Sequence, residues 1–231
     1  MGLGITPDTQ GATVDSLQIG SATNLYNETS DDYTILGNNV YFDGTNNKYI
    51  KTQESSRLMQ NAGEFTFNQA VSGSADANIT YTTPLKIDAN GYVTKPNNLC
   101  LQYTRSASTD YTSGTVIYNT LVFDVNSSGA YNTSTGVFTA PVTGVYLIYH
   151  EFYAQNNAIA MTQIDKSTNG GSSFSSVKFS PRAGGNSSEY LANGCSFFLQ
   201  MNVNDQFRIV VKEGIVHVNN KYTHLMVQLI Q

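Results

Sequence analysis

The chain has 231 residues, of which only 13% are charged, and its formal net charge at neutral pH is −5. Average soluble domains carry about 25% charged residues. Here strand-favouring Tyr, Phe and Thr and turn-favouring Asn, Gly and Ser predominate, which excludes a helical bundle or a coiled coil. The negative charge, without any Lys/Arg cluster, argues against nucleic-acid binding, and no apolar run approaches the roughly 20 residues of a membrane-spanning helix.

Residues 1–96 contain short apolar groups separated by Asn, Asp and Gly turns. Residues 42–50 and 87–93 each place an apolar residue and Asp before a turn, followed by Tyr and a β-branched residue, which predicts two β-hairpins. Isolated hairpins are marginally stable in water. We therefore expect an extended, hairpin-rich stalk that is stabilised by further copies of itself or by a neighbouring segment. The alternative is a loose, partly disordered linker.

Residues 95–98, Lys-Pro-Asn-Asn, mark a boundary, because Pro stops strand pairing and Asn favours turns. Residues 97–231 form the second predicted domain, an antiparallel β-sandwich with little helical character. Ten strands are predicted in it: Leu99–Thr104, Thr115–Tyr118, Leu121–Asp124, Val137–Ala140, Gly144–Ala154, Ala158–Lys166, Ser173–Phe179, Cys195–Met201, Gln206–Lys212 and Thr223–Ile230.

Two of these strands carry apolar residues on both faces. Phe197 and Phe198 are adjacent and must point to opposite sides of their strand. The last strand has Leu225 on one face and Met226 on the other. One face fills the core and the other needs a cover, so this domain is predicted to be an obligate oligomer.

The pattern Val122-Phe123-Asp124, followed by YNTSTGVFTAPVTGVY at 131–146, resembles the signature of C1q-like globular domains. Residues 199–207 look like the strand–turn–strand of that family, and residues 225–230 like its closing strand, although Asn204 stands where Gly is usual and no collagen-like repeat precedes the domain. The resemblance implies an all-β, ten-stranded jelly roll of the C1q/tumour-necrosis-factor type, assembled as a tight homotrimer. With the two-sided strands, this places five residues at the predicted trimer interface: Phe198, Tyr222, His224, Met226 and Ile230.

Residues 84–96, and more loosely 39–50, are similar to a phrase that recurs in bacteriophage and marine-virus fibre proteins ahead of a C-terminal head. Together the two resemblances imply a virion structural protein: an extracellular tail or capsid fibre whose N-terminal segment binds other virion proteins. Its head would then attach to the host surface. The alternative is a secreted or cell-surface C1q-like recognition or adhesion protein of a cellular organism.

No catalytic constellation is visible. His150-Glu151 begins like the zinc-protease pattern H-E-x-x-H, but Ala154 replaces the second His, and alternation in a strand puts His150 and Glu151 on opposite faces. Acidic residues stand singly, so no enzyme activity, cofactor or metal site is expected. Calcium stays open, since related heads sometimes bind it with loop Asp and Asn oxygens, but no dense acidic loop supports it.

Cys100 and Cys195 are predicted to remain unpaired, mostly buried thiols, because in a C1q-like arrangement two strands separate them within one sheet, far beyond disulfide reach. Ligand binding is predicted in the loops at 126–132, 169–173 and 181–189, since loops vary without disturbing a core. The candidates are Asn126, Tyr131, Asn169, Asn186 and Tyr190. Their side chains suit a host cell-surface glycan better than a protein; the alternative is that these are merely solvated turns.

Overall fold

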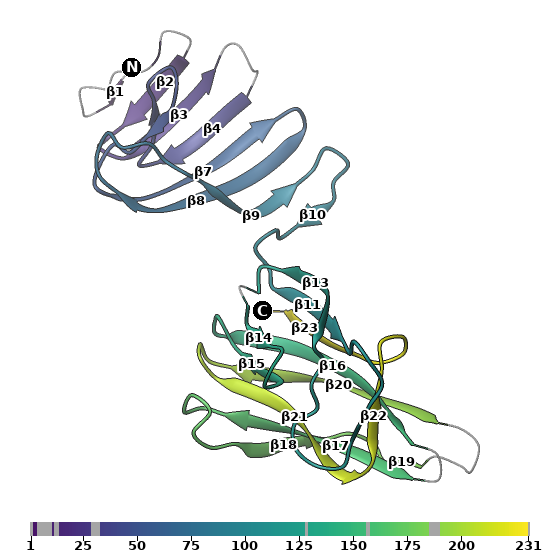
Figure 1. The fold of residues 1–231 in the computed structure, drawn as a ribbon. Coiled ribbons are helices and arrows are strands. Elements are labelled where there is room, and N and C mark those ends of the chain that lie inside the picture. The colour runs from purple at the N-terminus through teal and green to yellow at the C-terminus, as the bar shows by residue number, and fades with distance from the viewer. Residues whose placement is uncertain are drawn as a thin grey trace. The chain divides into compact units, whose positions relative to one another are not determined.

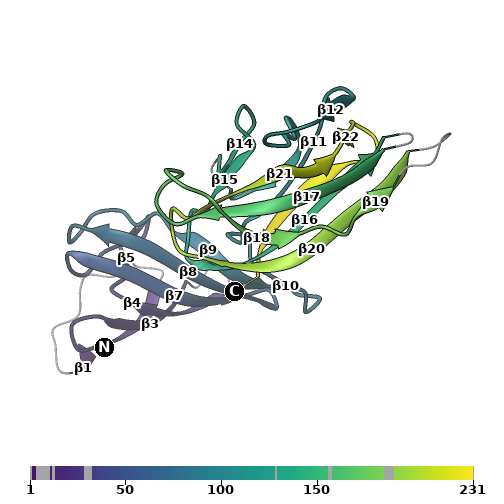
Figure 2. The same cartoon turned by 90° about the horizontal axis from the view of Figure 1, so that it is seen from below.

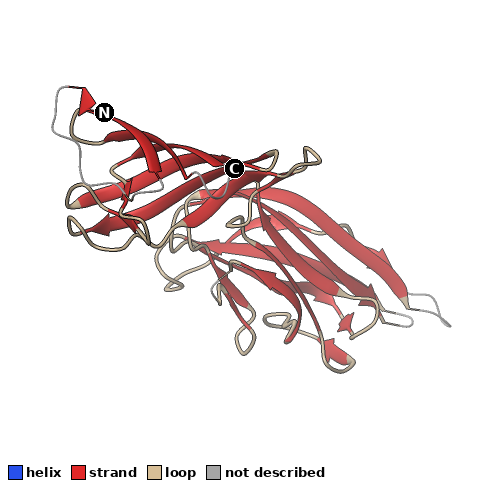
Figure 3. Cartoon of the chain, turned by 90° about the horizontal axis from the view of Figure 1, so that it is seen from above, coloured by secondary structure: helices blue, strands red, loops and turns tan. Residues whose placement is uncertain are grey.

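The computed structural model describes residues 2–3, 11, 14–28, 33–127, 129–155, 158–184 and 190–230. All regular secondary structure among these residues is β-strand, which confirms the predicted all-β class (Figure 3). The chain divides into two compact units, Met1–Asn97 and Asn98–Gln231, called here the N-terminal unit and the head. Asn186, a predicted ligand-binding residue, lies outside the described residues.

In the N-terminal unit, eight strands form one sheet in the order β1-β2-β3-β4-β7-β8-β9-β10, and β5 pairs separately with β6 (Figure 1). All pairs are antiparallel except β1 with β2. The strands are β1 (Gly2–Leu3), β2 (Val14–Ile19), β3 (Thr23–Glu28), β4 (Tyr33–Asn38), β5 (Tyr41–Phe42), β6 (Asn47–Lys48), β7 (Gln53–Asn61), β8 (Glu64–Gly73), β9 (Thr82–Ile87) and β10 (Val93–Thr94).

Both predicted hairpins are present, as β5–β6 and β9–β10. Each turn is held by an aspartate whose Oδ1 accepts two backbone N–H groups: Asp43 from residues 45 and 46, and Asp88 from residues 90 and 92. These backbone hydrogen bonds lower the pKa of Asp43. The unit is more than a string of hairpins, because Tyr26, Ile35 and Val40 bury a small core of its own.

In the head, seven strands form one sheet, β12-β22-β16-β23-β11-β13 with β20 paired to β16. Six form the other, β14-β15-β21-β17-β18 with β19 paired to β17 (Figure 2). One continuous core of buried side chains from both sheets fills the sandwich. The strands are β11 (Cys100–Thr104), β12 (Thr109–Tyr111), β13 (Thr120–Val125), β14 (Tyr131–Asn132), β15 (Val137–Thr139), β16 (Gly144–Ala154), β17 (Ile159–Ser167), β18 (Ser175–Phe179), β19 (Ala183–Gly184), β20 (Leu191–Met201), β21 (Gln206–Gly214), β22 (Val216–Val218) and β23 (His224–Leu229).

The count in the described part of the head is thirteen strands rather than the ten expected. Nine predicted strands are present, and β12, β14, β19 and β22 are additional short ones. The predicted strand Thr115–Tyr118 is wrong: only Thr115 forms a bridge, to Val210 of β21. Val116 and Tyr118 are buried in the core, so their apolar alternation reflects burial without continuous strand pairing.

Candidate functional site

The central strand of the head, β16, has two chemically different faces. Tyr146, Ile148 and Phe152 are fully buried in the core. The residues between them, such as Leu147 and Tyr149, therefore lie on the opposite side of the sheet. We call this side of strands β13, β11, β23, β16 and β20, together with the adjoining β22 and β12, the outer face.

One half of the outer face carries exposed apolar side chains separated by polar ones. The strand register aligns two cross-strand rows on it: Val125, Cys100, Gln228, Leu147 and Phe198 in the first, and Phe123, Gln102, Met226, Tyr149 and Ser196 in the second. Phe198 is 67% exposed, whereas its neighbour Phe197 packs against the core, which confirms that the two rings point to opposite sides. Phe198 and Met226 thus lie where a second subunit can reach them, and their place in a trimer interface stays a prediction.

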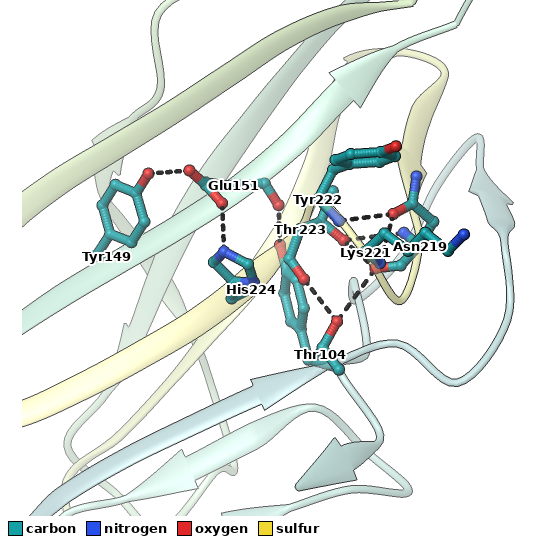
Figure 4. Close-up of polar contacts among 9 residues, drawn as sticks. Thr104, Tyr149, Glu151, Asn219, Lys221, Tyr222, Thr223 and His224 are labelled. Atoms are coloured by element: carbon teal, nitrogen blue, oxygen red, sulfur yellow. Dashed lines mark hydrogen bonds and ion pairs between the residues drawn. The ribbon is translucent and has the colours of Figure 1, made fainter. Parts of the chain in front are cut away.

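The centre of the outer face carries a polar cluster, Tyr149–Glu151–His224 (Figure 4). The Tyr149 hydroxyl donates to Glu151 Oε1, and His224 Nε2 lies 3.0 Å from Glu151 Oε2. Burial, the hydrogen bond to Glu151 and the charge of that carboxylate raise the pKa of Tyr149 to about 12, so its phenol remains a donor. The sequence placed His224 on this face but did not reveal its partner, because Glu151 comes from a different strand.

The far end of the outer face is a pocket with tyrosine walls. We define the tyrosine pocket by its lining residues, and its volume is about 380 Å³. The Tyr153 ring lies 6.3 Å from the ring of Tyr190 and 6.1 Å from that of Tyr222, at interplanar angles of 82° and 74°. The lining residues are Ser108, Tyr153, Tyr190, His217, Asn219 and Tyr222.

A row of three paired strands positions the histidine of this pocket. Register pairs Tyr153 of β16 with His217 of β22, and His217 with Asp110 of β12, so all three side chains share the outer face. His217 Nδ1 lies 2.6 Å from Asp110 Oδ1, and Gln155 donates to the other carboxylate oxygen of Asp110 at 2.7 Å. The Tyr190 ring lies 4.7 Å from the imidazole.

A tight turn fixes Tyr222 at the rim of the pocket (Figure 4). Asn219 Oδ1 accepts hydrogen bonds from the backbone N–H groups of Lys221 and Tyr222, both at 3.0 Å. The hydroxyl of Thr223 donates to Asn219 O at 2.7 Å, and that of Thr104, on β11, lies 2.8 Å from Thr223 O. Both threonines are buried, so the turn is anchored to the sheet.

On the core side, fully buried His150 and half-buried Cys195 form a pair that resembles a catalytic dyad only in composition. His150 Nε2 lies 2.7 Å from Thr162 Oγ1, and its Nδ1 lies 3.7 Å from Cys195 Sγ. Desolvation lowers the pKa of His150 to about 4, and burial raises the pKa of the Cys195 thiol. Both groups are therefore neutral near pH 7, which is the opposite of an activated thiolate–imidazolium pair.

The two cysteines are free, as predicted, but both are half-buried rather than mostly buried. Cys100 lies on β11 and Cys195 on β20, and the strands β23 and β16 separate them in the sheet. Burial raises the pKa of both thiols. This arrangement keeps them apart and weakly reactive.

The predicted binding residues do not form one site. The prediction that Tyr131 binds ligand is corrected. Tyr131 is 4% exposed, its ring contacts Tyr103, and its hydroxyl accepts a hydrogen bond from the backbone N–H of Tyr118, so it belongs to the core. Asn126 and Asn169 lie in loops at the end of the head where β16 begins, whereas Tyr190 precedes β20 at the end where β16 finishes.

Of the predicted interface residues, Tyr222 is in the turn before β23 and lines the tyrosine pocket. Ile230 follows β23, is 42% exposed, and donates its backbone N–H to Val145 O. Sequence reasoning missed Tyr153, His217 and Asn219 as site residues. Tyr153 follows Tyr149 on the outer-face alternation of β16, which was a usable signal, but only tertiary folding brings His217 and Tyr222 beside it.

Comparison with known proteins gives one family. Residues 101–225, more than half of the chain, match the model of the C1q domain. Solved structures with similar folds include murine APRIL at pH 5.0 (10% identity, TM-score 0.47) and the Eiger TNF of S. frugiperda (12% identity, TM-score 0.46). Each covers 58% of this chain, with 99% and 94% of its own chain matched.

The globular domain of the zebrafish complement 1qA protein is 14% identical, with a TM-score of 0.43 over 59% of this chain and 98% of that one. No curated protein matches the chain. Among the described residues, no helix is long and apolar enough to span a bilayer, and no group of three His, Cys, Asp or Glu side chains is placed to hold a metal ion.

Proposed function

The chain belongs to the C1q domain family, and on this premise we propose that it is a homotrimeric attachment protein whose head binds a ligand on another surface. The observation that carries the proposal is the set of exposed apolar side chains on the outer face: Phe198 on β20 at one edge of the sheet, and Val125 and Phe123 on β13 at the other. Exposed apolar side chains at both edges of one sheet face are typical of an interaction surface. We assign it to further copies of the head.

The polar cluster at the centre of the outer face is compatible with burial in such an interface. Glu151 is already hydrogen-bonded by Tyr149 and lies against His224, so covering the cluster leaves no carboxylate without a partner. The other predicted interface residues, Met226 and Ile230, extend the same face and its edge. The proposed interface therefore combines an apolar half with an internally paired centre.

A second apolar surface supports a stalk role for the N-terminal unit. Leu36 is 52% exposed and Phe67 is 40% exposed, on the side of the sheet away from buried Tyr26 and Ile35. Register aligns six residues across six strands, which we call the apolar ladder: Leu17, Leu25, Leu36, Leu58, Phe67 and Leu85. In a trimer, the three N-terminal units are tethered to one head, so each meets the others at a local concentration of about 1 mM. We propose that copies of the ladder cover one another.

The finer proposal is that the protein is a fibre or spike of a virion, attached through its N-terminal segment to other virion proteins, with the head at the host surface. The resemblance of residues 84–96 to viral fibre sequences supports it, and those residues form β9 and β10 immediately ahead of the head. The alternative is a secreted or cell-surface adhesion protein of a cellular organism. An antibody against the head separates them, by labelling particle appendages in electron micrographs or labelling cell surfaces.

Recognition rather than catalysis is proposed because the His150–Cys195 pair is neutral, with the imidazole fully buried and the thiol half-buried. The remaining histidines, His217 and His224, are each paired with a carboxylate. Neither pair has an adjacent nucleophile such as Ser or Cys with which it shares a hydrogen bond among the described residues. A reaction assay on glycan substrates that shows turnover contradicts this part of the proposal.

Light scattering of the full chain tests the assembly. A mass three times the 25.1 kDa of one chain is expected. Phe198→Asp places a charge in the proposed head interface and is expected to abolish that mass. Val203→Asp is the matched control, because Val203 is 52% exposed but lies in the turn after β20 and not on a strand of the outer face. A monodisperse wild-type monomer refutes the proposal.

The ladder is tested separately with Leu36→Lys, and Tyr92→Lys is the control because Tyr92 is 70% exposed in the β9–β10 turn. We expect Leu36→Lys to raise the susceptibility of the N-terminal unit to proteolysis while the head keeps its trimeric mass. Equal proteolysis in Leu36→Lys and Tyr92→Lys contradicts the stalk assignment and leaves the head interface standing.

A further inference from the structure

The tyrosine pocket has unused hydrogen-bonding groups. Among the described residues, no hydrogen-bond partner is found for the hydroxyls of Tyr153, Tyr190 and Tyr222, whereas the side chains of His217 and Asn219 are hydrogen-bonded. His217 is only 9% exposed, and its Nδ1 is taken by Asp110. Its Nε2 has no hydrogen bond among the described residues and is not one of the buried atoms without a partner, and His217 lines the pocket.

The pocket is also preorganised. The turn at 219–223 is tied to β11 through buried threonines, and Tyr153 stands on the central strand of the sheet. Preorganisation lowers the entropy that a ligand loses on binding. The rings of Tyr190 and Tyr222 stand at steep angles to that of Tyr153, so the hollow presents aromatic surface on more than one side.

The charge balance of the pocket selects the class of ligand. The two carboxylates near the pocket are both engaged: Asp110 has one oxygen on His217 and the other on Gln155, and Glu151, two residues before Tyr153, is held by Tyr149 and His224. A cationic ligand therefore finds no carboxylate oxygen that lacks a partner. No Lys or Arg lines the pocket, so an anionic ligand finds no counter-charge either. What remains is a set of neutral donors and acceptors beside aromatic rings, which suits a neutral ligand with several hydroxyl groups and apolar C–H faces.

We propose that the tyrosine pocket binds a neutral saccharide, with a pyranose ring stacked on a tyrosine and its hydroxyls hydrogen-bonded by Asn219, His217 and the phenols. The volume of about 380 Å³ lies at the lower end of the roughly 300–1,000 Å³ range of small-molecule pockets and holds a mono- or disaccharide. The inference deepens the proposed attachment role and rests on it for its biological meaning.

The site differs from the predicted one. It uses Tyr190 from the predicted loops, adds Tyr153, and assigns Tyr222 to ligand binding rather than to the subunit interface. Three copies in a trimer raise avidity by about 10²–10⁴ over one weak site. A weak single-site affinity is therefore sufficient for attachment.

The test uses the full chain and saturation-transfer NMR with methyl glycosides of glucose, galactose, mannose, fucose and the N-acetylhexosamines, and their disaccharides, up to about 10 mM. At least one saccharide is expected to bind the wild type. Tyr153→Ala and Tyr222→Ala are expected to weaken binding at least about 10-fold, and Tyr222→Phe, which keeps the ring, less. Tyr92→Ala is the matched control, because Tyr92 is an exposed tyrosine of the N-terminal unit, and its binding should equal that of the wild type.

Three results of the binding experiment overturn the proposal: no saccharide binds, binding survives both alanine variants, or tetramethylammonium binds and saccharides do not. Light scattering on the same samples separates this site from the proposed function. A trimer that loses saccharide binding only in the pocket variants supports the site. Loss of trimeric mass in Tyr222→Ala returns that residue to the subunit interface and overturns the assignment. A wild-type trimer without saccharide binding refutes the pocket and leaves the attachment role intact.

Discussion

Acidification is expected to destabilise the head through one residue, His150. Its imidazole is fully buried between Thr162 and Cys195, and desolvation lowers its pKa from 6.5 to about 4. Between these two values the unfolded chain binds a proton that the folded head does not. The contribution of neutral His150 to the stability of the head is therefore complete above about pH 6.5, falls as the pH is lowered, and is lost near pH 4.

The size of the effect follows from the shift. A difference of about 2.5 pKa units corresponds to about 3 kcal/mol, at 1.36 kcal/mol per unit, and most of it, about 2.5 kcal/mol, is already lost at pH 4.5. The variant His150→Gln supplies a side chain that still hydrogen-bonds but does not titrate. Its free energy of unfolding is lower at pH 7, because the fit is poorer, but it should change less between pH 7 and pH 4.5.

Hydrogen exchange of β16 peptides, corrected for intrinsic rates, reports the free energy of opening of the head. The β7 peptides of the N-terminal unit are an internal reference, since all three histidines of the chain lie in the head. The difference between wild type and His150→Gln isolates the contribution of His150 from those of His217 and His224. If β16 loses the same protection on acidification in both proteins, the reasoning about His150 is refuted.

Three further predictions concern the two cysteines, the side chain of Asn39 and the glycine at position 136. Alkylation of the unfolded chain without reductant should label both Cys100 and Cys195 by mass; a single or missing label contradicts the free-thiol arrangement. Asn39→Ala should destabilise the N-terminal unit by about 3 kcal/mol, because the buried amide makes four hydrogen bonds to backbone groups; exchange of β7 peptides measures this, and unchanged protection argues against it. Gly136→Ala should destabilise the head by about 1–3 kcal/mol, since its φ is +71° and an added Cβ meets Val116 O at 2.9 Å; an unaltered melting temperature of the head contradicts it.

Local patterns gave the elements that depend on neighbouring residues. The hairpin turns at 43–46 and 88–91 were readable because aspartate caps the same chain segment that turns, and both are observed. Alternation correctly separated Phe197 from Phe198 and His150 from Glu151. Alternation failed at Thr115–Tyr118, because a buried chain segment shows the same apolar pattern whether or not it pairs along its length.

The sequence by itself determined the all-β class, most strands of the head and the likeness to C1q domains, since these depend on residue periodicity and on a contiguous motif. Only the tertiary structure decided that Tyr131 is core and that Asn126 and Tyr190 lie at opposite ends of the head. It alone brought Tyr153, His217 and Tyr222 around one pocket. The physical reason is that sheet order joins strands distant along the chain, and no local pattern encodes which strands become neighbours.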